Sequence, residues 1–282
     1  MRWRRAGLVG LATLAGVYAV AYVAARSWES RALYFPERGL GVPVAELGGS
    51  AERIEFTTRD GVTLVGWTLP AEPTGAAAAA ARWIVVCHGN GGNIASPGRL
   101  RQYAALRGLG LNVLTFDYRG YGESGGTPSE RGLYADAEAA YRYLRERRNI
   151  PPERIILFGH SLGSAVAVDL AAHVPAAGLI VEGALSSVID RAQEIYPWAP
   201  LWLLPFSRYA ALDKIGGVAG PKLFLHAVAD NVIPLAHGRR LYDAAPPPKE
   251  FVELQGGHDD AFAVDSARYF ESIARFVAHL SP

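Results

Sequence analysis

One serine stands in a setting that suits chemistry at its hydroxyl. The stretch GHSLG places Ser161 between Gly159 and Gly163, after the apolar residues 155–158 and before the small, apolar residues 165–172. The first run is typical of a strand buried on both faces, and the second of a buried helix. A strand that turns this abruptly into a helix needs a strained corner residue and neighbours without side chains. The pattern predicts a nucleophile elbow; the alternative is a turn whose serine only caps the helix.

A serine hydroxyl becomes a nucleophile when a base removes its proton, and that base is usually a histidine oriented by a carboxylate. Of the seven histidines, His258 follows the last predicted strand, in a loop where α/β sheets gather their sites. Asp230 follows the strand before it in the equivalent place. We predict His258 as the base and Asp230 as the acid. The alternatives are a purely structural role for His258, and Glu182, after another strand, as the acid.

Acyl transfer also needs two N–H donors for the negative charge that develops on the attacked carbonyl oxygen. The backbone N–H of Leu162, directly after the serine, is the expected first donor. The glycine-rich loop 88–93, HGNGGN, follows the first central strand and presents Asn90 as the second. Taken alone, this loop is also typical of a general anion-binding nest. Its combination with the elbow favours an oxyanion hole formed by Asn90 and Leu162.

These residues require a sheet whose strands end at one edge. Strands that alternate with helices predict an α/β fold with a mostly parallel central sheet covered by helices on both faces. The Asp60-Gly61 pair predicts a β-hairpin before it, and helices are expected over 133–148 and 261–280. The predicted strands are 53–58, 62–69, 83–86, 112–116, 155–158, 178–181, 222–228 and 250–254.

One apolar segment interrupts the alternation. Residues 196–206 read YPWAPLWLLPF, and three prolines within them argue against a plain core helix. Insertions that cover a site have this character, as do surfaces that touch a membrane. We predict a small lid over about 184–214, with Trp198, Trp202 and Phe206 as candidate substrate contacts.

The first residues of the chain predict a membrane anchor. Three arginines within residues 1–5 precede 6–25, a stretch without a charged residue that is long enough to cross a bilayer as a helix. We therefore divide the chain into an anchor, 1–31, and a catalytic domain, 32–282. The basic flank predicts that this domain lies outside the cytoplasm. A cleaved signal peptide is the alternative, because Ala19-Val20-Ala21 offers a cleavage site and would give a secreted protein.

The composition limits the partners. The net charge is +1 without a lysine-rich block, which argues against nucleic acid. The single cysteine, Cys87, lies in an apolar run and is expected to be buried. No metal-binding motif is present, and we predict neither a metal nor a cofactor. The expected partners are a small-molecule or lipid ester and the membrane, while the oligomeric state is not indicated.

The motifs together resemble the α/β-hydrolase superfamily, and within it the membrane-anchored Bem46-like serine hydrolases. The resemblance rests on LYFPER at 33–38, HGNGGN at 88–93, the long FDYRGYGES motif from 116, GHSLG at 159–163 and GGHDD at 256–260. Similar proteins commonly have His-Gly before the acid loop, where this chain has His226-Ala227. The resemblance also implies the chain order Ser161, Asp230, His258.

Membership of this family implies hydrolysis of carboxylic esters or acyl thioesters through an acyl-enzyme on Ser161, without a cofactor. The apolar segment at 196–206 favours a substrate with an apolar acyl chain. Two other functions stay open: an acyltransferase that uses the same acyl-enzyme, and a non-catalytic binding scaffold.

Overall fold

The computed structural model describes residues 31–42, 44–47, 51–72, 81–199, 201 and 206–280, together with scattered residues between 13 and 30. Most of the predicted anchor, residues 6–25, lies outside the described residues, and so does Trp202. No helix within the described part is long and apolar enough to cross a bilayer.

An eight-stranded sheet forms the centre of the molecule, in the order β10-β9-β8-β7-β4-β6-β3-β2. Neighbours from β10 to β6 are parallel, whereas β3 runs antiparallel to both β6 and β2. The mostly parallel sheet is therefore confirmed, and every predicted strand is present within two residues of its expected ends. The strands are β2 (Glu52–Thr57), β3 (Thr63–Leu69), β4 (Trp83–Cys87), β6 (Asn112–Phe116), β7 (Ile155–His160), β8 (Gly178–Glu182), β9 (Lys222–Ala227) and β10 (Lys249–Leu254).

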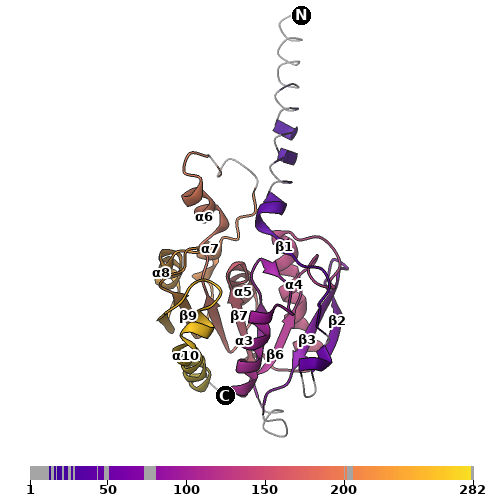
Figure 1. Cartoon of the computed structure of the whole chain (residues 1–282), viewed down its shortest axis with the longest axis vertical. Coiled ribbons are helices and arrows are strands. Elements are labelled where there is room, and N and C mark those ends of the chain that lie inside the picture. Colours follow the sequence, from indigo (N-terminus) through magenta and orange to yellow (C-terminus); the bar gives the residue numbers. More distant parts are fainter. Residues whose placement is uncertain are drawn as a thin grey trace, which may run out of the picture.

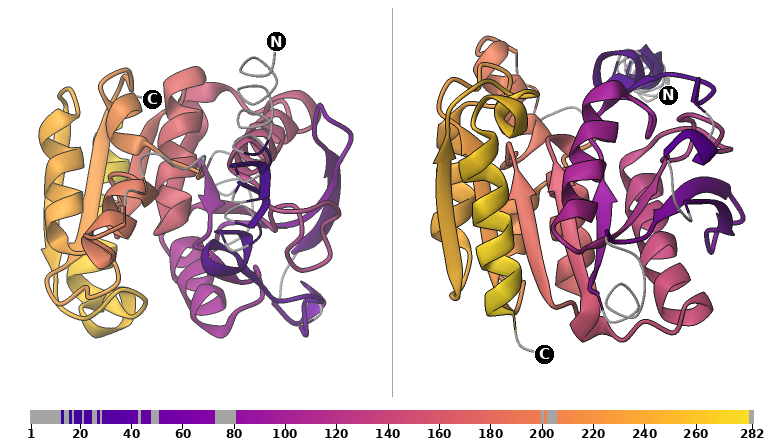
Figure 2. Two further views of the ribbon diagram at one scale, coloured as in Figure 1. Left: turned by 90° about the horizontal axis from the view of Figure 1, so that it is seen from above. Right: turned by 60° about the horizontal axis from the view of Figure 1, so that its bottom comes forward.

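Helices cover both faces of this sheet (Figure 2). Neighbouring residues of one strand belong to different cores: Val85 belongs to the core that includes residues of α4, α5 and α8, and Ile84 to the core that includes residues of α3 and α10. The central strands are apolar without alternation because both of their faces are buried in this way. These helices are α3 (Pro97–Gly108), α4 (Glu130–Arg142), α5 (Leu162–His173), α8 (Leu235–Ala244) and α10 (Ser266–His279).

The predicted helices have the local signals that begin and end such elements. Ser129 caps α4, since its hydroxyl accepts the N–H of Gly132 at 3.2 Å. The expected helix 133–148 is α4 followed by a π-helical turn, η2 (Tyr143–Arg147). The expected helix 261–280 is divided into α9 (Ala261–Val264) and α10.

The segment between β8 and β9 holds the predicted lid region. Its described elements are α6 (Val188–Ile195) and α7 (Ala211–Ile215). A separate two-stranded parallel pair joins β1 (Phe35–Pro36) to β5 (Gly91–Gly92). Figure 1 shows α6 and β1 at the same end of the sheet, which is also where the carboxyl ends of the parallel strands lie.

Candidate active site

The turn from β7 into α5 has the geometry of a nucleophile elbow. Ser161 has φ 55° and ψ −124°, a conformation that non-glycine residues rarely adopt. A Cβ added to Gly163 would lie 2.0 Å from the carbonyl oxygen of Cys87, and one added to Gly159 would lie 2.2 Å from that of Gly163. Both glycines are therefore needed for the close approach of backbone to backbone. Cys87 is buried as predicted, and burial raises the pKa of its thiol to about 12.

Ser161, His258 and Asp230 form one hydrogen-bonded chain. His258 Nε2 lies 2.8 Å from Ser161 Oγ, and His258 Nδ1 lies 2.6 Å from Asp230 Oδ2. The other carboxylate oxygen of Asp230 accepts the N–H groups of Val232 at 2.9 Å and Ile233 at 2.7 Å. The Ser161 hydroxyl makes no capping bond to α5, so a serine that only caps the helix is excluded. The arrangement allows His258 to take the Ser161 proton while Asp230 holds the ring.

The charges around His258 stabilise its protonated form. Burial alone disfavours the imidazolium, but the hydrogen bond and charge of Asp230, with the nearby carboxylates of Asp259 and Glu182, raise the pKa of His258 above its ordinary value of 6.5. For Asp230, burial acts to raise the pKa, and the contacts with His258 and the Ile233 N–H outweigh it, so the pKa of Asp230 is lowered. The pair therefore favours an ionised acid beside a histidine that can store a proton.

The backbone N–H of Leu162 begins helix α5 and, as a first-turn group, has no partner within the helix. The N–H of Asn90 belongs to the peptide whose carbonyl is that of Gly89. This carbonyl accepts a hydrogen bond from Nδ1 of His88 at 2.7 Å and a weaker one from Arg99 at 3.5 Å. Because the N–H and C=O of a trans peptide point in opposite directions, holding the carbonyl also aims the Asn90 N–H.

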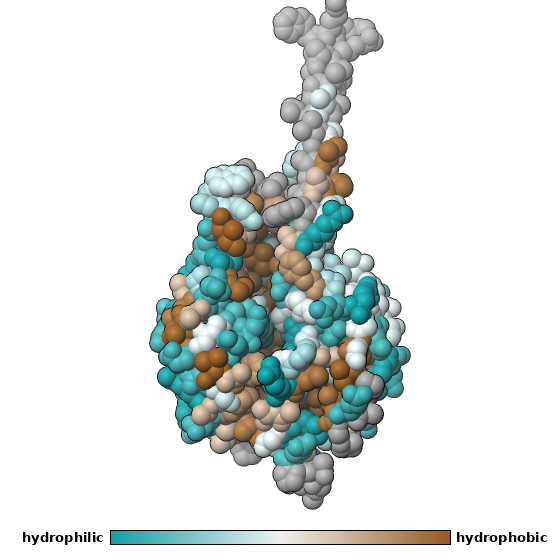
Figure 3. All heavy atoms as spheres, in the orientation of Figure 1, coloured by the Kyte–Doolittle hydropathy of each residue, from teal (hydrophilic) through white to brown (hydrophobic). Residues whose placement is uncertain are grey.

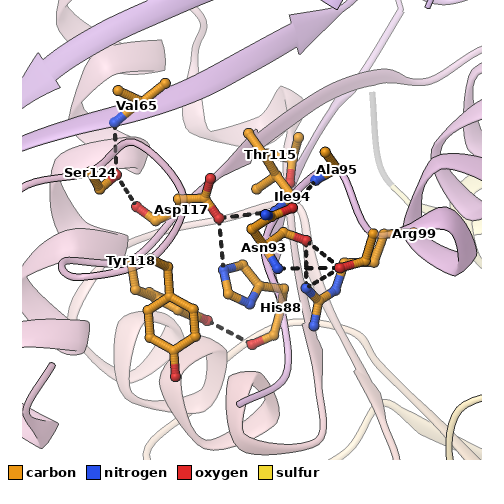
Figure 4. A network of polar contacts seen from close by, with 12 residues as sticks. Val65, His88, Asn93, Ile94, Ala95, Arg99, Thr115, Asp117, Tyr118 and Ser124 are labelled. Atoms are coloured by element: carbon orange, nitrogen blue, oxygen red, sulfur yellow. Dashed lines mark hydrogen bonds and ion pairs between the residues drawn. The ribbon is translucent and has the colours of Figure 1, made fainter. Parts of the chain in front are cut away.

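Arg99 braces the whole glycine-rich loop (Figure 4). Besides its bond to Gly89, its guanidinium donates to the carbonyl of Gly91 at 2.7 Å and to that of Asn93 at 2.6 Å. With these carbonyls turned toward the guanidinium, the loop keeps one conformation beside Ser161. No sequence pattern points to Arg99, because an arginine six residues after the loop has nothing to distinguish it.

Behind the loop, His88 is fully buried, and burial lowers its pKa well below the ordinary range, with the charge of Arg99 adding to the effect. A neutral His88 donates from Nδ1 to Gly89 and presents Nε2 to Asp117, whose Oδ1 lies 3.7 Å away (Figure 4). Burial also raises the pKa of Asp117 to about 7. Through these contacts His88 supports the loop from behind.

The segment after the predicted anchor is part of the same loop structure. Asn90 accepts a hydrogen bond from the N–H of Phe35 at 3.0 Å and from the hydroxyl of Tyr121 at 2.8 Å, and its side chain donates to the carbonyl of Leu33 at 3.0 Å. Strands β1 and β5 continue this contact. No local pattern joins these residues to the loop, because more than fifty positions separate Leu33 and Phe35 from Asn90.

Two pockets meet at Ser161. The first, of about 320 Å³, is mostly apolar, and in the space-filling view hydrophobic side chains line a hollow beside α6 (Figure 3). The second, of about 380 Å³, lies on the His258 side and is lined by more polar groups than the first, so we call it the polar pocket. The apolar pocket includes Leu33, Leu185, Val188, Ala192, Ile195 and Phe206. The polar pocket includes Arg99, Gln102, His160, Glu182, Asp259 and Phe262.

Two of the candidate substrate contacts, Phe206 and Trp198, lie in different places. Phe206 lines the apolar pocket, as expected. Trp198 lines neither pocket: it is 82% exposed and packs edge-on against Tyr196, so the structure does not support it as a substrate contact in this conformation. The physical reason is that the chain turns outward at residues 197–198, directly after α6 ends.

Glu182, the alternative acid, forms its hydrogen bonds with residues other than His258. Glu182 accepts hydrogen bonds from Tyr269 at 2.9 Å and Gln102 at 3.2 Å, and the His258 ring bonds to Asp230 instead. One group of possible metal ligands occurs among the described residues: His160, His258 and Asp259. Both ring nitrogens of His258 are already engaged with Ser161 and Asp230, so this group offers no separate metal site.

Comparisons with known proteins agree with this architecture. Residues 82–214 match the family described as the alpha/beta hydrolase fold. An uncharacterized protein of Mycobacterium tuberculosis is 37% identical over 252 residues, which cover 89% of this chain and 88% of that protein. The chain belongs to the α/β-hydrolase superfamily. The resemblance to α/β-hydrolases found in the sequence is thereby confirmed at the level of the superfamily.

Two further proteins extend the comparison. The uncharacterized protein YfhR of Escherichia coli is 37% identical over 219 residues, covering 76% of this chain and 75% of YfhR. A solved esterase of Pyrococcus furiosus superposes with a TM-score of 0.72, covering 89% of this chain and 99% of the esterase. At 19% identity, that likeness concerns the fold alone.

Proposed function

We propose that this α/β-hydrolase is a serine hydrolase that cleaves carboxylic esters or acyl thioesters. The observation that carries the proposal is the unbroken chain from Ser161 Oγ through His258 to Asp230, beside two candidate oxyanion donors. Those donors are the backbone N–H groups of Asn90 and Leu162. Its membership of a superfamily whose solved neighbours include esterases supports the same class of reaction.

In the proposed reaction, His258 removes the Ser161 proton as the oxygen attacks the carbonyl carbon. The negative charge on the former carbonyl oxygen is stabilised by the N–H groups of Asn90 and Leu162. When the bond to the leaving group breaks, the imidazolium gives its proton to the departing oxygen or sulfur. Water, deprotonated by His258, then attacks the acyl-enzyme and returns Ser161 to its starting state.

The apolar pocket supports an acyl chain as the substrate part held next to Ser161. Its lining residues come from α6, from the segment after β8 and from the chain before β1. Burying methylene groups there stabilises the complex by about 0.8 kcal/mol per CH₂. The transition state for longer acyl chains gains most from this contribution.

We further propose the narrower assignment to the membrane-anchored Bem46-like hydrolases. The motifs that include LYFPER at 33–38 and the uncharged stretch at 6–25 support it. In this arrangement the domain after residue 31 lies outside the cytoplasm and meets lipid esters at the membrane. Cleavage after residues 19–21, which would release a secreted enzyme, is the alternative.

A fluorophosphonate probe, which reacts only with an activated serine, tests the proposal on the full chain in detergent. We expect the wild type to be labelled and Ser161→Ala to be unlabelled. Asp230→Asn should react about 10²- to 10⁴-fold more slowly, because His258 loses the partner that fixes its tautomer. A folded wild-type protein that is neither labelled nor active on esters would favour the binding-scaffold alternative.

The acyltransferase alternative uses the same acyl-enzyme and differs only in what attacks it. Product analysis with and without an added alcohol separates the two. Free acid as the main product in the presence of the alcohol supports a hydrolase, whereas an ester product in large excess over acid supports a transferase.

A further inference from the structure

We propose that the polar pocket beside Ser161 binds the leaving alcohol and selects a polyol, such as glycerol or a sugar, through the carboxylate of Glu182. The inference rests on the proposed ester hydrolysis and specifies its substrate class. It starts from the arrangement of the two pockets, which meet at Ser161 and share the residues Asn90 and Val232.

An ester bound for attack extends in two directions from its carbonyl carbon. Once the apolar pocket holds the acyl chain, the leaving group must extend to the other side of Ser161. The polar pocket lies there, next to His258, which delivers the proton to the departing oxygen. With about 380 Å³, this pocket has the size of a small-molecule site.

Glu182 is the unusual group in this pocket. It ends β8, lies beside His160 of β7 in the sheet register, and is only 4% exposed. One carboxylate oxygen, Oε2, accepts the hydroxyl of Tyr269 and the amide of Gln102. Within the described part of the chain, no arginine or lysine forms an ion pair with Glu182, and both hydrogen bonds to its carboxylate end on Oε2. Because Glu182 lines the pocket, its other oxygen, Oε1, can accept a hydroxyl group of a ligand there.

The charges of the pocket exclude other leaving groups. Arg99 also lines the pocket, but its Nη1 and Nη2 groups donate to the loop carbonyls, and two carboxylates, Glu182 and Asp259, line the same pocket. An anionic leaving group therefore meets two carboxylates and a guanidinium whose terminal nitrogens are already engaged. A cationic leaving group would repel the imidazolium that forms on His258 during attack. A neutral alcohol with further hydroxyl groups avoids both penalties.

The test compares three esters with the same octanoyl chain: 1-octanoylglycerol, ethyl octanoate and octanoylcholine, all below their micelle concentrations. The full chain is assayed at a pH where His258 is neutral. In the wild type we expect kcat/KM for the glycerol ester to exceed that for the ethyl ester at least tenfold. In Glu182→Gln this ratio should fall about five- to tenfold, because a neutral amide replaces a charge-assisted acceptor.

Glu253→Gln is the matched control. It makes the same chemical change on the exposed side of β10, where Glu253 pairs with Arg239, and it should keep the wild-type ratio. Labelling of Glu182→Gln by the fluorophosphonate probe shows that its elbow is intact. A ratio within twofold of wild type in Glu182→Gln, or a wild-type preference for the choline ester, overturns the inference and leaves the proposed hydrolysis standing.

A second measurement needs no variant. Ethyl octanoate is hydrolysed by the wild type in mixtures of glycerol and isopropanol at equal hydroxyl concentration. We expect the acyl-enzyme to form the glycerol ester in at least fivefold excess, since the alcohol that attacks binds where the leaving alcohol binds. Equal capture of both alcohols contradicts a polyol site, whereas the absence of turnover and of probe labelling overturns the proposed function itself.

Discussion

His258 lies among three carboxylates, and this setting decides the pH range in which it can serve as a base. Asp230 contacts its ring directly, while Asp259 and Glu182 act through their charges. All three stabilise the imidazolium and so raise the pKa of His258. In the proposed mechanism the neutral ring removes the Ser161 proton, so kcat/KM is expected to fall as the pH drops through this raised pKa.

Asp259→Asn should move the acidic limb of this pH profile, which is the range over which kcat/KM falls. The substitution removes a negative charge whose oxygen lies within 4.8 Å of a His258 nitrogen, which makes the imidazolium less stable and lowers the pKa of His258. We expect the midpoint of the kcat/KM profile to shift to lower pH by about half a pH unit. Asp243→Asn, at the exposed end of α8, is the control. Coincident limbs for Asp259→Asn and the wild type would contradict the prediction.

At the scale of elements, the elbow depends on how closely α5 and β7 approach β4. Gly163→Ala would place a methyl group 2.0 Å from the carbonyl oxygen of Cys87, in backbone that cannot easily move. We expect the free energy of unfolding, measured in urea, to fall by about 3 kcal/mol or more. Gly108→Ala is the control, because a Cβ there meets nothing within 4 Å and alanine favours the helix by about 0.5–1 kcal/mol. Equal stabilities for the two variants would contradict this account of the elbow.

The second element is β1, which supports the glycine-rich loop from outside the main sheet. Phe35→Pro removes the N–H that Asn90 accepts, without shortening the chain. Loss of one backbone hydrogen bond to the loop corresponds to about 1 kcal/mol. We expect the second-order rate of fluorophosphonate labelling to fall about fivefold while the thermal unfolding midpoint changes little. Phe35→Ala, which keeps the N–H and removes only the side chain, is the control. An unchanged labelling rate in Phe35→Pro would show that β1 does not position Asn90.

Whether a feature could be predicted from the sequence depends on how far apart in the chain its interacting residues lie. The strands and the elbow arise from local patterns, an apolar run or glycines on both sides of Ser161, and such patterns are visible in a sequence. Asp230 and His258 were predictable because parallel strands end at one edge of a sheet. The contacts of Glu182 with Tyr269 and of Asn90 with Leu33 join residues more than fifty positions apart, and no local pattern encodes them.

At the scale of the whole molecule, one serine lies between an apolar pocket and a more polar one. The division arises because α6 covers one side of Ser161 while α3 and the His258 loop border the other. The substrate is therefore expected to be amphipathic, with its ester bond at the boundary. This expectation joins the proposed acyl pocket to the inferred polyol site in a single substrate.

Ala192→Phe tests the acyl side of that division. Ala192 lies on α6 and lines the apolar pocket, so a phenyl ring there fills space that a long chain needs. The wild-type kcat/KM should rise up to about fourfold per added CH₂ until the pocket is full. In Ala192→Phe, the ratio of decanoyl to acetyl ester activity should fall at least tenfold. Ala171→Phe, on α5 away from both pockets, is the control, and equal ratios in Ala192→Phe and the wild type would argue against an acyl site here.

The pairing of β1 with β5 also has a mechanical consequence. Tension applied to the chain before Leu33 reaches the hydrogen bonds of Leu33 and Phe35 to Asn90 before it reaches any strand of the central sheet. Part of this tension passes to residues 207–209, just before α7. There Glu29 accepts the N–H of Ser207, and the hydroxyl groups of Tyr34 and Tyr209 lie 2.8 Å apart. Both walls of the apolar pocket are thus coupled to the chain before Leu33, and a pull on that chain would act on the site before it acts on the central sheet.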